Sequence, residues 1–156
     1  MFLAIPLKKQ ASLSRAEDLK NFHGLLPHPE GGFFKETYRS AHSTAIFYLL
    51  NEGAKSSLHR IKSDELWHFY EGDELIIVEL LSSGEVRETK LNKENPQHIV
   101  PGGVWFGAYL GEGSTYAFVG CTVSPAFHYS DFEIGKKAEL LAQFPKAQTI
   151  IERLNS

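Results

Sequence analysis

The stretch SLHRIKSDELWHFYEGDEL, residues 57–75, decides the fold. It holds two runs rich in aromatic and aliphatic residues, and the second run meets the next apolar run at the tight turn Glu71-Gly72-Asp73. Gly and Asp suit such turns, because Gly accepts a positive φ and Asp hydrogen-bonds its own backbone. Runs joined this closely indicate antiparallel strands, because parallel strands need a crossover of a dozen or more residues.

The same pattern continues on both sides of this stretch. Runs rich in Val, Ile, Tyr, Phe and Thr alternate with Gly, Asn, Ser and Asp. They predict strands at 33–40, 44–50, 56–62, 65–71, 74–81, 85–91, 98–101, 104–110, 115–123 and 126–130. Many short strands with frequent turns are typical of a sandwich or barrel, so the sequence predicts a mainly β fold.

Helices are predicted towards the two ends of the chain. Ser14–Glu17 and Ser130–Glu133 both match a capping box, in which Ser and a Glu three residues later bond each other's backbone N–H groups. Gly24 is expected to end the first helix in a left-handed conformation. The predicted helices cover 14–23, 130–144 and a short segment from Pro145 with Ile150, Ile151 and Leu154 on one face.

The composition limits the class of protein. The chain has 156 residues, a net charge of −3 and 42% hydrophobic residues, which predicts a single domain over residues 1–156. No Lys- or Arg-rich stripe is present to neutralise phosphates, which argues against a nucleic-acid partner. Cys121 is the one cysteine, which excludes a disulfide framework and a multi-cysteine metal site. No apolar stretch is long enough to span a membrane, so we expect a soluble, cytoplasmic protein without membrane contact.

Part of the central stretch falls on a known spacing. The first motif of the cupin superfamily is Gly-x5-His-x-His-x3-Glu-x6-Gly, and Ile61 replaces its second histidine. The residues that match it are Gly53, His59, Glu65 and Gly72. The second cupin motif, Gly-x5-Pro-x-Gly-x2-His-x3-Asn, is matched at Pro101 and Gly103, with Phe106 at its histidine. The chain therefore resembles a cupin.

Longer strings narrow the resemblance to one branch of the cupins. HPEGGFFKETYRS (28–40), the central stretch, VPGGVWFGA (100–108) and VGCTVSPAFHYSDFE (119–133) are similar to a family of unknown function, often filed as the fifth cupin family. Ala126 and His128 depart from that pattern, where Gly and Asp are expected. The resemblance implies a double-stranded β-helix, or jelly roll, paired as a homodimer. It implies no assigned reaction.

The resemblance also bears on metal binding. A cupin metal is held by three histidines and one carboxylate, a set that suits Mn, Fe, Ni, Cu or Zn. His59 and Glu65 keep two of these positions, whereas Ile61 and Phe106 have no lone pair to donate. Two ligands plus water hold a divalent ion weakly. We expect no tight metal site and no cofactor, and a metal-dependent cupin enzyme is a less favoured alternative.

His59 and Glu65 are the candidate catalytic residues. Side chains alternate between the faces of a strand, so if Glu65 points into the barrel then Trp67 and Phe69 do as well, and His68 points out. The candidate ligand-binding residues are Ser57, Trp67, Phe69, Trp105, Phe106, Tyr38 and Tyr48. The four aromatic residues Trp67, Phe69, Trp105 and Phe106 fit barrel packing and an apolar cavity wall equally well. By contrast, residues 28–32 (HPEGG) are interpreted as a turn, and Cys121 as a buried, inert thiol.

Two functions with a small-molecule partner fit this set. The first is a metal-independent isomerase or epimerase acting on a carbohydrate-like substrate, similar to dTDP-4-dehydrorhamnose 3,5-epimerase. By that similarity His59 is the base, Glu65 orients it or raises its pKa, and Tyr38 or Tyr48 is the acid. The second is a protein that binds a small, partly hydrophobic ligand without chemistry. A second titratable group facing His59 across the cavity favours the enzyme.

We predict that the protein is a homodimer, because the family resemblance implies one and because pairing of outer strand faces would cover His68 and nearby aromatic residues. Sedimentation at micromolar concentration should give about twice the 17.5 kDa mass of one chain. A mass near 17.5 kDa would contradict this prediction.

Overall fold

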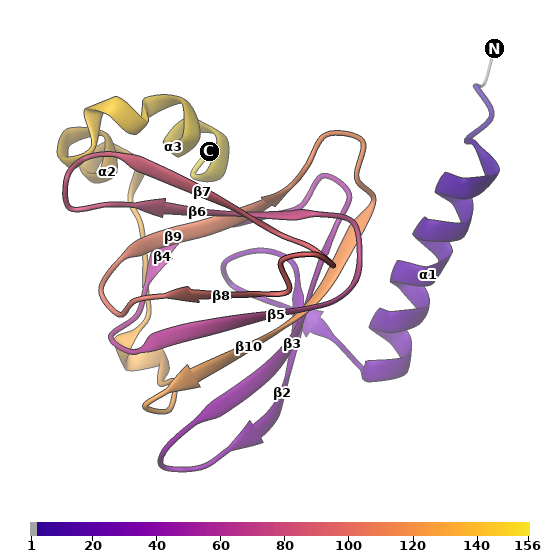
Figure 1. The fold of residues 1–156 in the computed structure, drawn as a ribbon, viewed down its shortest axis with the longest axis horizontal. Helices are drawn as coiled ribbons and strands as arrows, with labels where there is room; N and C mark the ends of the chain where they lie inside the picture. Colours follow the sequence, from indigo (N-terminus) through magenta and orange to yellow (C-terminus); the bar gives the residue numbers. More distant parts are fainter. Residues whose placement is uncertain (1–2) are drawn as a thin grey trace.

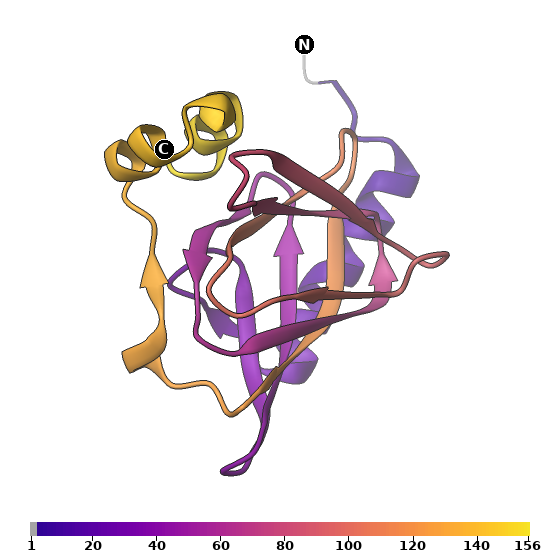
Figure 2. The ribbon, with the colours of Figure 1, turned by 60° about the vertical axis from the view of Figure 1, so that its left-hand side comes forward.

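The structure is a computed structural model and describes residues 3–156. Its strands are β1 (Leu26–Pro27), β2 (Phe33–Arg39), β3 (Thr44–Asn51), β4 (Lys55–Arg60), β5 (Asp64–Gly72), β6 (Leu75–Leu80), β7 (Val86–Leu91), β8 (Gln97–Val100), β9 (Trp105–Leu110), β10 (Tyr116–Ser124) and β11 (Glu133–Ile134). They form two antiparallel sheets, ordered β1-β2-β3-β10-β5-β8 and β11-β4-β9-β6-β7, which face each other (Figures 1 and 2). The predicted mainly β, antiparallel fold is confirmed.

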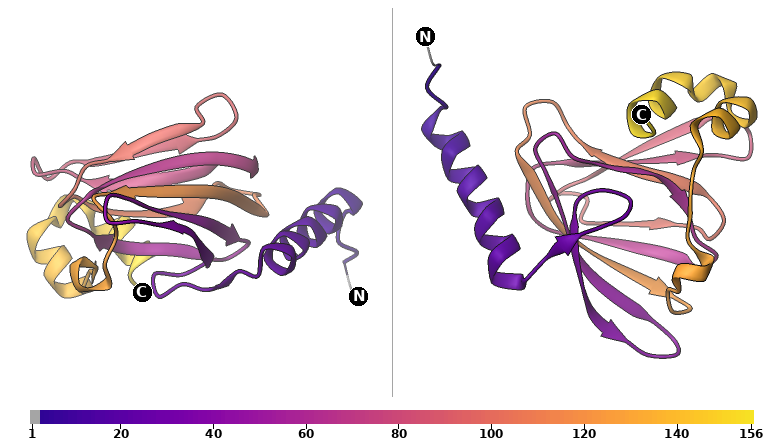
Figure 3. Two further views of the ribbon diagram at one scale, coloured as in Figure 1. Left: turned by 90° about the horizontal axis from the view of Figure 1, so that it is seen from below. Right: turned by 180° about the vertical axis from the view of Figure 1, so that it is seen from behind.

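Helices lie at opposite sides of the two sheets, the N-terminal helix beside the strands at one end and the C-terminal helices at the other (Figures 1 and 3). They are α1 (Leu7–His23), α2 (Lys137–Gln143) and α3 (Gln148–Leu154), with 3-10 turns η1 (Tyr129–Asp131) and η2 (Pro145–Ala147). Ala16 and Leu19 of α1 pack on Leu49 and Phe118 of the six-stranded sheet. Apolar residues of α2 and α3 pack on the outer face of the five-stranded sheet. No helix within residues 3–156 is long and apolar enough to cross a bilayer.

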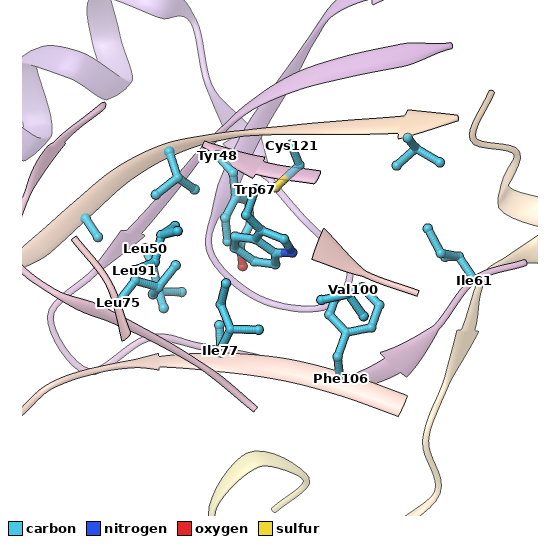
Figure 4. Close-up of a cluster of buried hydrophobic side chains, with 14 residues drawn as sticks. Tyr48, Leu50, Ile61, Trp67, Leu75, Ile77, Leu91, Val100, Phe106 and Cys121 are labelled. Carbon is cyan, nitrogen blue, oxygen red and sulfur yellow. The ribbon is translucent and has the colours of Figure 1, made fainter. Parts of the chain in front are cut away.

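Inward-facing side chains of both sheets form the core, because side chains alternate between strand faces. Figure 4 shows Leu50, Leu75 and Leu91 packed together at one end of this cluster. Phe106 lies towards the other end, and Ile61 lies beyond it. A cavity lies at the Ile61 end.

Strand β4 departs from regular alternation. Its pairing with β9 shifts register between Ser56 and His59, which is the signature of a β-bulge. Ser56 and His59 are therefore both buried on the inner side, although they are three residues apart. Leu58 points the other way and packs among the residues of α3, including Leu154.

The C-terminal residues satisfy the backbone of this bulge. Asn155 Oδ1 accepts the N–H of Leu58 at 3.0 Å, and Asn155 Nδ2 donates to the carbonyl of Gly135 at 2.9 Å. Lys55 Nζ donates to the carbonyl of Arg153 at 2.8 Å. Residues 153–155 thus clamp the strand that carries His59.

Two predicted boundaries and one predicted strand are wrong. Helix α1 begins at Leu7 instead of Ser14, because good helix formers precede Ser14 and Pro6 supplies a suitable entry. Helix α2 begins at Lys137, because Glu133 and Ile134 pair with β4 and so leave the helical conformation. The strand predicted at 126–130 is irregular chain followed by η1.

Other boundaries are confirmed. Gly24 ends α1 with φ 63°, in the left-handed region where Gly is favoured. Pro145 opens η2, and Ile150, Ile151 and Leu154 are the buried residues of α3.

We predict that Asn155→Ala lowers the free energy of unfolding by about 1–3 kcal/mol, because the buried N–H of Leu58 loses its partner. Gln148→Ala is the control, since Gln148 bonds only the exposed Glu152 nearby, and should change it by less than about 0.5 kcal/mol. Urea unfolding measures both. An Asn155→Ala effect no larger than the control would contradict the clamp.

Candidate functional site

One end of the barrel holds a cavity of about 130 Å³. It lies between the inner faces of β2, β3, β4, β5 and β10, and the β1–β2 loop and residues 126–132 close it. Most of its wall is aromatic or aliphatic, and its polar groups are those of His28, Glu30, Glu36, Thr44, His59, Glu65, Cys121 and Tyr129. A concave, mainly apolar site with a few convergent polar groups is the usual form of a small-molecule site.

A buried ion pair lies at the centre of the polar wall. Nε2 of His59 lies 2.8 Å from Oε2 of Glu30. Nδ1 of the same ring lies 2.6 Å from the carbonyl of Ser57, which can only accept, so Nδ1 carries a proton. Both side chains are less than 10% exposed. Glu30, and not the predicted Glu65, is therefore the carboxylate that orients His59.

The pKa shifts of His59 and Glu30 both favour the charged forms of the pair. Burial alone lowers the pKa of His59, but the charge and hydrogen bond of Glu30 outweigh burial and raise it. Burial alone raises the pKa of Glu30, but His59 outweighs burial and lowers it. Both ring nitrogens of His59 face acceptors, so the pair is an imidazolium and a carboxylate, which leaves His59 no lone pair with which to act as a base.

His28 is the second histidine of the cavity. Its Nδ1 accepts the backbone N–H of Glu30 at 3.1 Å, so the neutral ring carries its proton on Nε2. Burial is the main cause that lowers the pKa of His28; the charge of Glu30 opposes it, and the charge of His59 lowers the pKa further. His28 is therefore neutral at pH 7 and carries an N–H on Nε2.

The loop that carries His28 and Glu30 is held tightly against β4. A Cβ on Gly31, whose φ is 111°, would lie 1.9 Å from the carbonyl of Lys55, so only Gly fits there. Tyr48 donates its hydroxyl to the carbonyl of Gly31 at 2.6 Å. The N–H of Ser57 donates to the carbonyl of Glu30 at 2.8 Å. The turn predicted at 28–32 exists, and its tight seat brings the Glu30 side chain into the barrel.

Glu65 enters the cavity from β5. Burial, and then the negative charge of Glu30, raise its pKa from 4.5 to about 7, against a smaller opposing effect of His59. Burial, and then the charges of Glu65 and Glu30, raise the pKa of the neighbouring Cys121 thiol well above its ordinary value. Glu65 therefore exchanges a proton near neutral pH, whereas Cys121 stays a neutral thiol.

His59 and Glu65 line the cavity, and the other predicted site residues do not. The Ser57 side chain is not part of the wall, because the β4 bulge reverses the expected alternation, although its backbone bonds both Glu30 and His59. Tyr48 does not line the cavity and instead holds the β1–β2 loop through its hydrogen bond to the Gly31 carbonyl. Tyr38 is 56% exposed and lies outside.

The four predicted aromatic residues contribute packing. Phe106 packs against the His59 ring at a tilted angle of 51° with centroids 4.2 Å apart, and Trp67 packs edge-on behind Phe106. Phe69 packs at the border of the inner core. Trp105 lies on the opposite side of its sheet, in the cluster beneath α2 and α3, and stacks with Arg60.

Sequence reasoning missed Glu30 and His28 as site residues. The string HPEGG contains two titratable side chains beside paired glycines, and close approach of a glycine backbone to another strand was the available signal.

The residues present do not fit a cupin metal. Nε2 of His59 is occupied by Glu30 and Nδ1 by Ser57, and hydrocarbon stands at Ile61 and Phe106. No group of three His, Cys, Asp or Glu side chains within residues 3–156 is placed to hold an ion.

Comparison with known proteins places the fold. The family model described as cupin superfamily (DUF985), Cupin_5, matches residues 17–135. A crystal structure of a protein from Shewanella oneidensis is 34% identical, with TM-score 0.85, and the match covers 90% of this chain and 97% of that one. A hypothetical protein from Leishmania major is 31% identical, with TM-score 0.84, covering 90% and 98%.

A more distant likeness extends to an enzyme. Oxalate decarboxylase from Bacillus subtilis matches with TM-score 0.60 and 16% identity, over 82% of this chain and 36% of that one. At this identity the likeness shows the jelly-roll fold alone. No curated protein matches the chain.

We predict that wild-type protein loses stability relative to Glu65→Gln as the pH rises. A carboxyl whose pKa is raised on folding holds its proton more tightly in the folded state, so its ionisation between about pH 4.5 and 7 favours unfolding. The difference in unfolding free energy between the two proteins should shift by about 2–3 kcal/mol in favour of Gln between pH 5 and 8. Denaturant unfolding at both pH values tests this, and a pH-independent difference would contradict it.

Proposed function

The chain belongs to the Cupin_5 family of the cupin superfamily (DUF985), and within that fold we propose that it catalyses a metal-independent proton transfer on a small carbonyl compound. Glu65 carries this proposal, because it is a carboxyl group, 8% exposed, in the wall of a cavity, with a pKa of about 7. A catalytic acid or base works best when its pKa lies near the operating pH.

Glu65 is the group that moves the proton. As a carboxylate it takes a proton from the carbon next to the substrate carbonyl, and the electrons of the C–H bond form a C=C bond while the carbonyl oxygen gains negative charge. For an α-hydroxy carbonyl compound this gives an enediolate. Return of the proton from Glu65 to the neighbouring carbon, with transfer of the hydroxyl proton between the two oxygens, moves the carbonyl by one carbon and completes an isomerisation.

His28 supplies a hydrogen-bond donor for the carbonyl oxygen. Its ring is neutral, its Nδ1 accepts the Glu30 N–H, and His28 lines the cavity, so its Nε2–H is the donor left for a substrate oxygen. A fixed donor aimed at an oxygen that gains charge stabilises the transition state. His28 thus takes the role that the sequence assigned to a tyrosine.

The His59–Glu30 pair is a positioning element in this scheme. It fixes the loop that carries His28, and the Glu30 carboxylate raises the pKa of Glu65. This differs from the sequence hypothesis, in which His59 was the base.

The cavity volume limits the substrate. An apolar cavity of about 150 Å³ holds benzene, with six carbons, so a cavity of about 130 Å³ fits roughly six to eight non-hydrogen atoms. A sugar of three or four carbons has this size, and a nucleotide sugar exceeds it. The aliphatic wall at Ile46, Ile61 and Val123 supports the alternative function, a protein that binds a small ligand without chemistry.

Deuterium uptake tests the proposal without knowledge of the product. The protein is incubated in D₂O with glyceraldehyde, dihydroxyacetone, erythrose or aminoacetone, and ¹H NMR follows loss of signal at the carbons beside the carbonyl. We predict uptake above the buffer rate for at least one compound, reduced about 10²–10⁴-fold in Glu65→Gln.

Glu79→Gln is the matched control, because Glu79 is also a buried carboxyl inside the barrel, bonds His98 at 2.8 Å and does not line the cavity. It should keep the wild-type rate. Uptake at the buffer rate with every compound, or uptake that survives Glu65→Gln, would refute the proton-transfer function.

A further inference from the structure

Aromatic rings surround the outer part of the cavity. Phe127, Tyr129 and Phe132 form a triangle, with centroids 5.0 Å apart for the first two and 6.1 Å from each to Phe132. Phe34 is a fourth aromatic ring of the cavity. It packs against His28, and the two ring centroids are 4.5 Å apart. All four phenyl or phenol rings line the cavity. Such rings carry negative charge on their faces and attract cations.

Most of the charged side chains in the cavity wall are carboxylates, so they carry the same sign of charge as the ring faces. Glu30, Glu36 and Glu65 line it, and His59 is the one cationic side chain among the lining residues that the structure describes. The His59 imidazolium already forms an ion pair with Glu30. Arg39, which lies near the cavity, donates two hydrogen bonds of 2.7 and 2.8 Å to Glu36 and a third to the carbonyl of Phe127. Glu65 is more than nine-tenths buried and has no ion-pair partner within residues 3–156.

Neighbouring groups report the same negative potential. After burial, the charges of Glu30 and Glu36 are the causes that raise the pKa of Tyr129. Likewise, after burial, Glu65 and Glu30 raise the pKa of Cys121. Glu30 is paired with His59 and Glu36 with Arg39, so Glu65 is the lining carboxylate whose charge is left uncompensated, and its ionised form repels an anion and attracts a cation.

The geometry points to a small organic cation, a protonated amine or a quaternary ammonium group, as the ligand class of this cavity, held between the ring triangle and the Glu65 carboxylate. This inference rests on the proposed function, because it assigns the charged part of the same substrate. The reacting carbonyl lies towards Glu65 and His28, and the ammonium group lies towards Phe127, Tyr129 and Phe132. Burial of a cation needs such partners, because an unpaired buried charge is strongly disfavoured.

Three compounds of similar size and shape separate charge from shape. Choline is the cation, 3,3-dimethylbutan-1-ol is its neutral isostere with carbon in place of nitrogen, and 3,3-dimethylbutanoate is an anion with the same tert-butyl head. Choline has seven non-hydrogen atoms, within the size range that the cavity sets. Calorimetry at pH 8 should show choline binding about tenfold more tightly than the alcohol, and the anion binding more weakly than both.

Variants locate the effect. Tyr129→Leu and Phe132→Leu should each weaken choline binding about tenfold and leave binding of the alcohol within twofold, because leucine keeps apolar contact and removes the ring. Phe22→Leu, at an aromatic residue that is 85% exposed on α1, is the control and should change neither. Circular dichroism verifies that each variant is folded.

Three results would overturn the inference: equal or tighter binding of the alcohol, preference for the anion, or no binding of any probe at 10 mM. None of these requires turnover, so failure here is distinct from failure of the proton-transfer function. Glu65-dependent deuterium uptake without choline selectivity would refute the cation alone. Selective choline binding without uptake would support the cation and refute the chemistry.

Discussion

The bulge in β4 is the irregularity on which the rest of the molecule depends. With regular alternation, Ser56 and His59 would point to opposite sides of the sheet. The extra residue lets Ser56 and His59 share the inner side while Leu58 anchors the C-terminal helices outside. It also turns the Ser57 carbonyl towards Nδ1 of His59, which fixes the ring for its contact with Glu30. One strand thus joins the cavity to the outer helical layer.

The replacement of two cupin ligand positions by hydrocarbon changes what the remaining polar groups do. With Ile61 in the cavity wall and Phe106 against the His59 ring, His59 pairs with a carboxylate from a loop. Burial of Glu65 and the like charge of Glu30 then both raise the pKa of Glu65. The polar centre therefore suits movement of protons, because one carboxyl titrates near neutrality beside a fixed ion pair.

The sequence predicted the strands well, because alternation and turn residues are local properties. Motif spacing also found His59 and Glu65. It missed Glu30, because strand alternation says nothing about which way a loop side chain points, and the loop is set by the approach of Gly31 to Lys55. Ser57 was misplaced because the bulge that reverses its direction depends on β9 and Asn155, which are distant in sequence. The second capping box failed for a similar reason, since pairing with β4 overrides local helix preference at Glu133.

The clamp on β4 has a practical consequence for handling the protein. Arg153 and Asn155 bond the strand that holds His59, so any extension attached after Ser156 would join the chain next to that clamp. An affinity tag there risks disturbing the ligand site during the very experiments meant to characterise it. The N-terminal end of α1 lies far from residues 126–132 (Figures 1 and 3). That end is the better place for a purification handle.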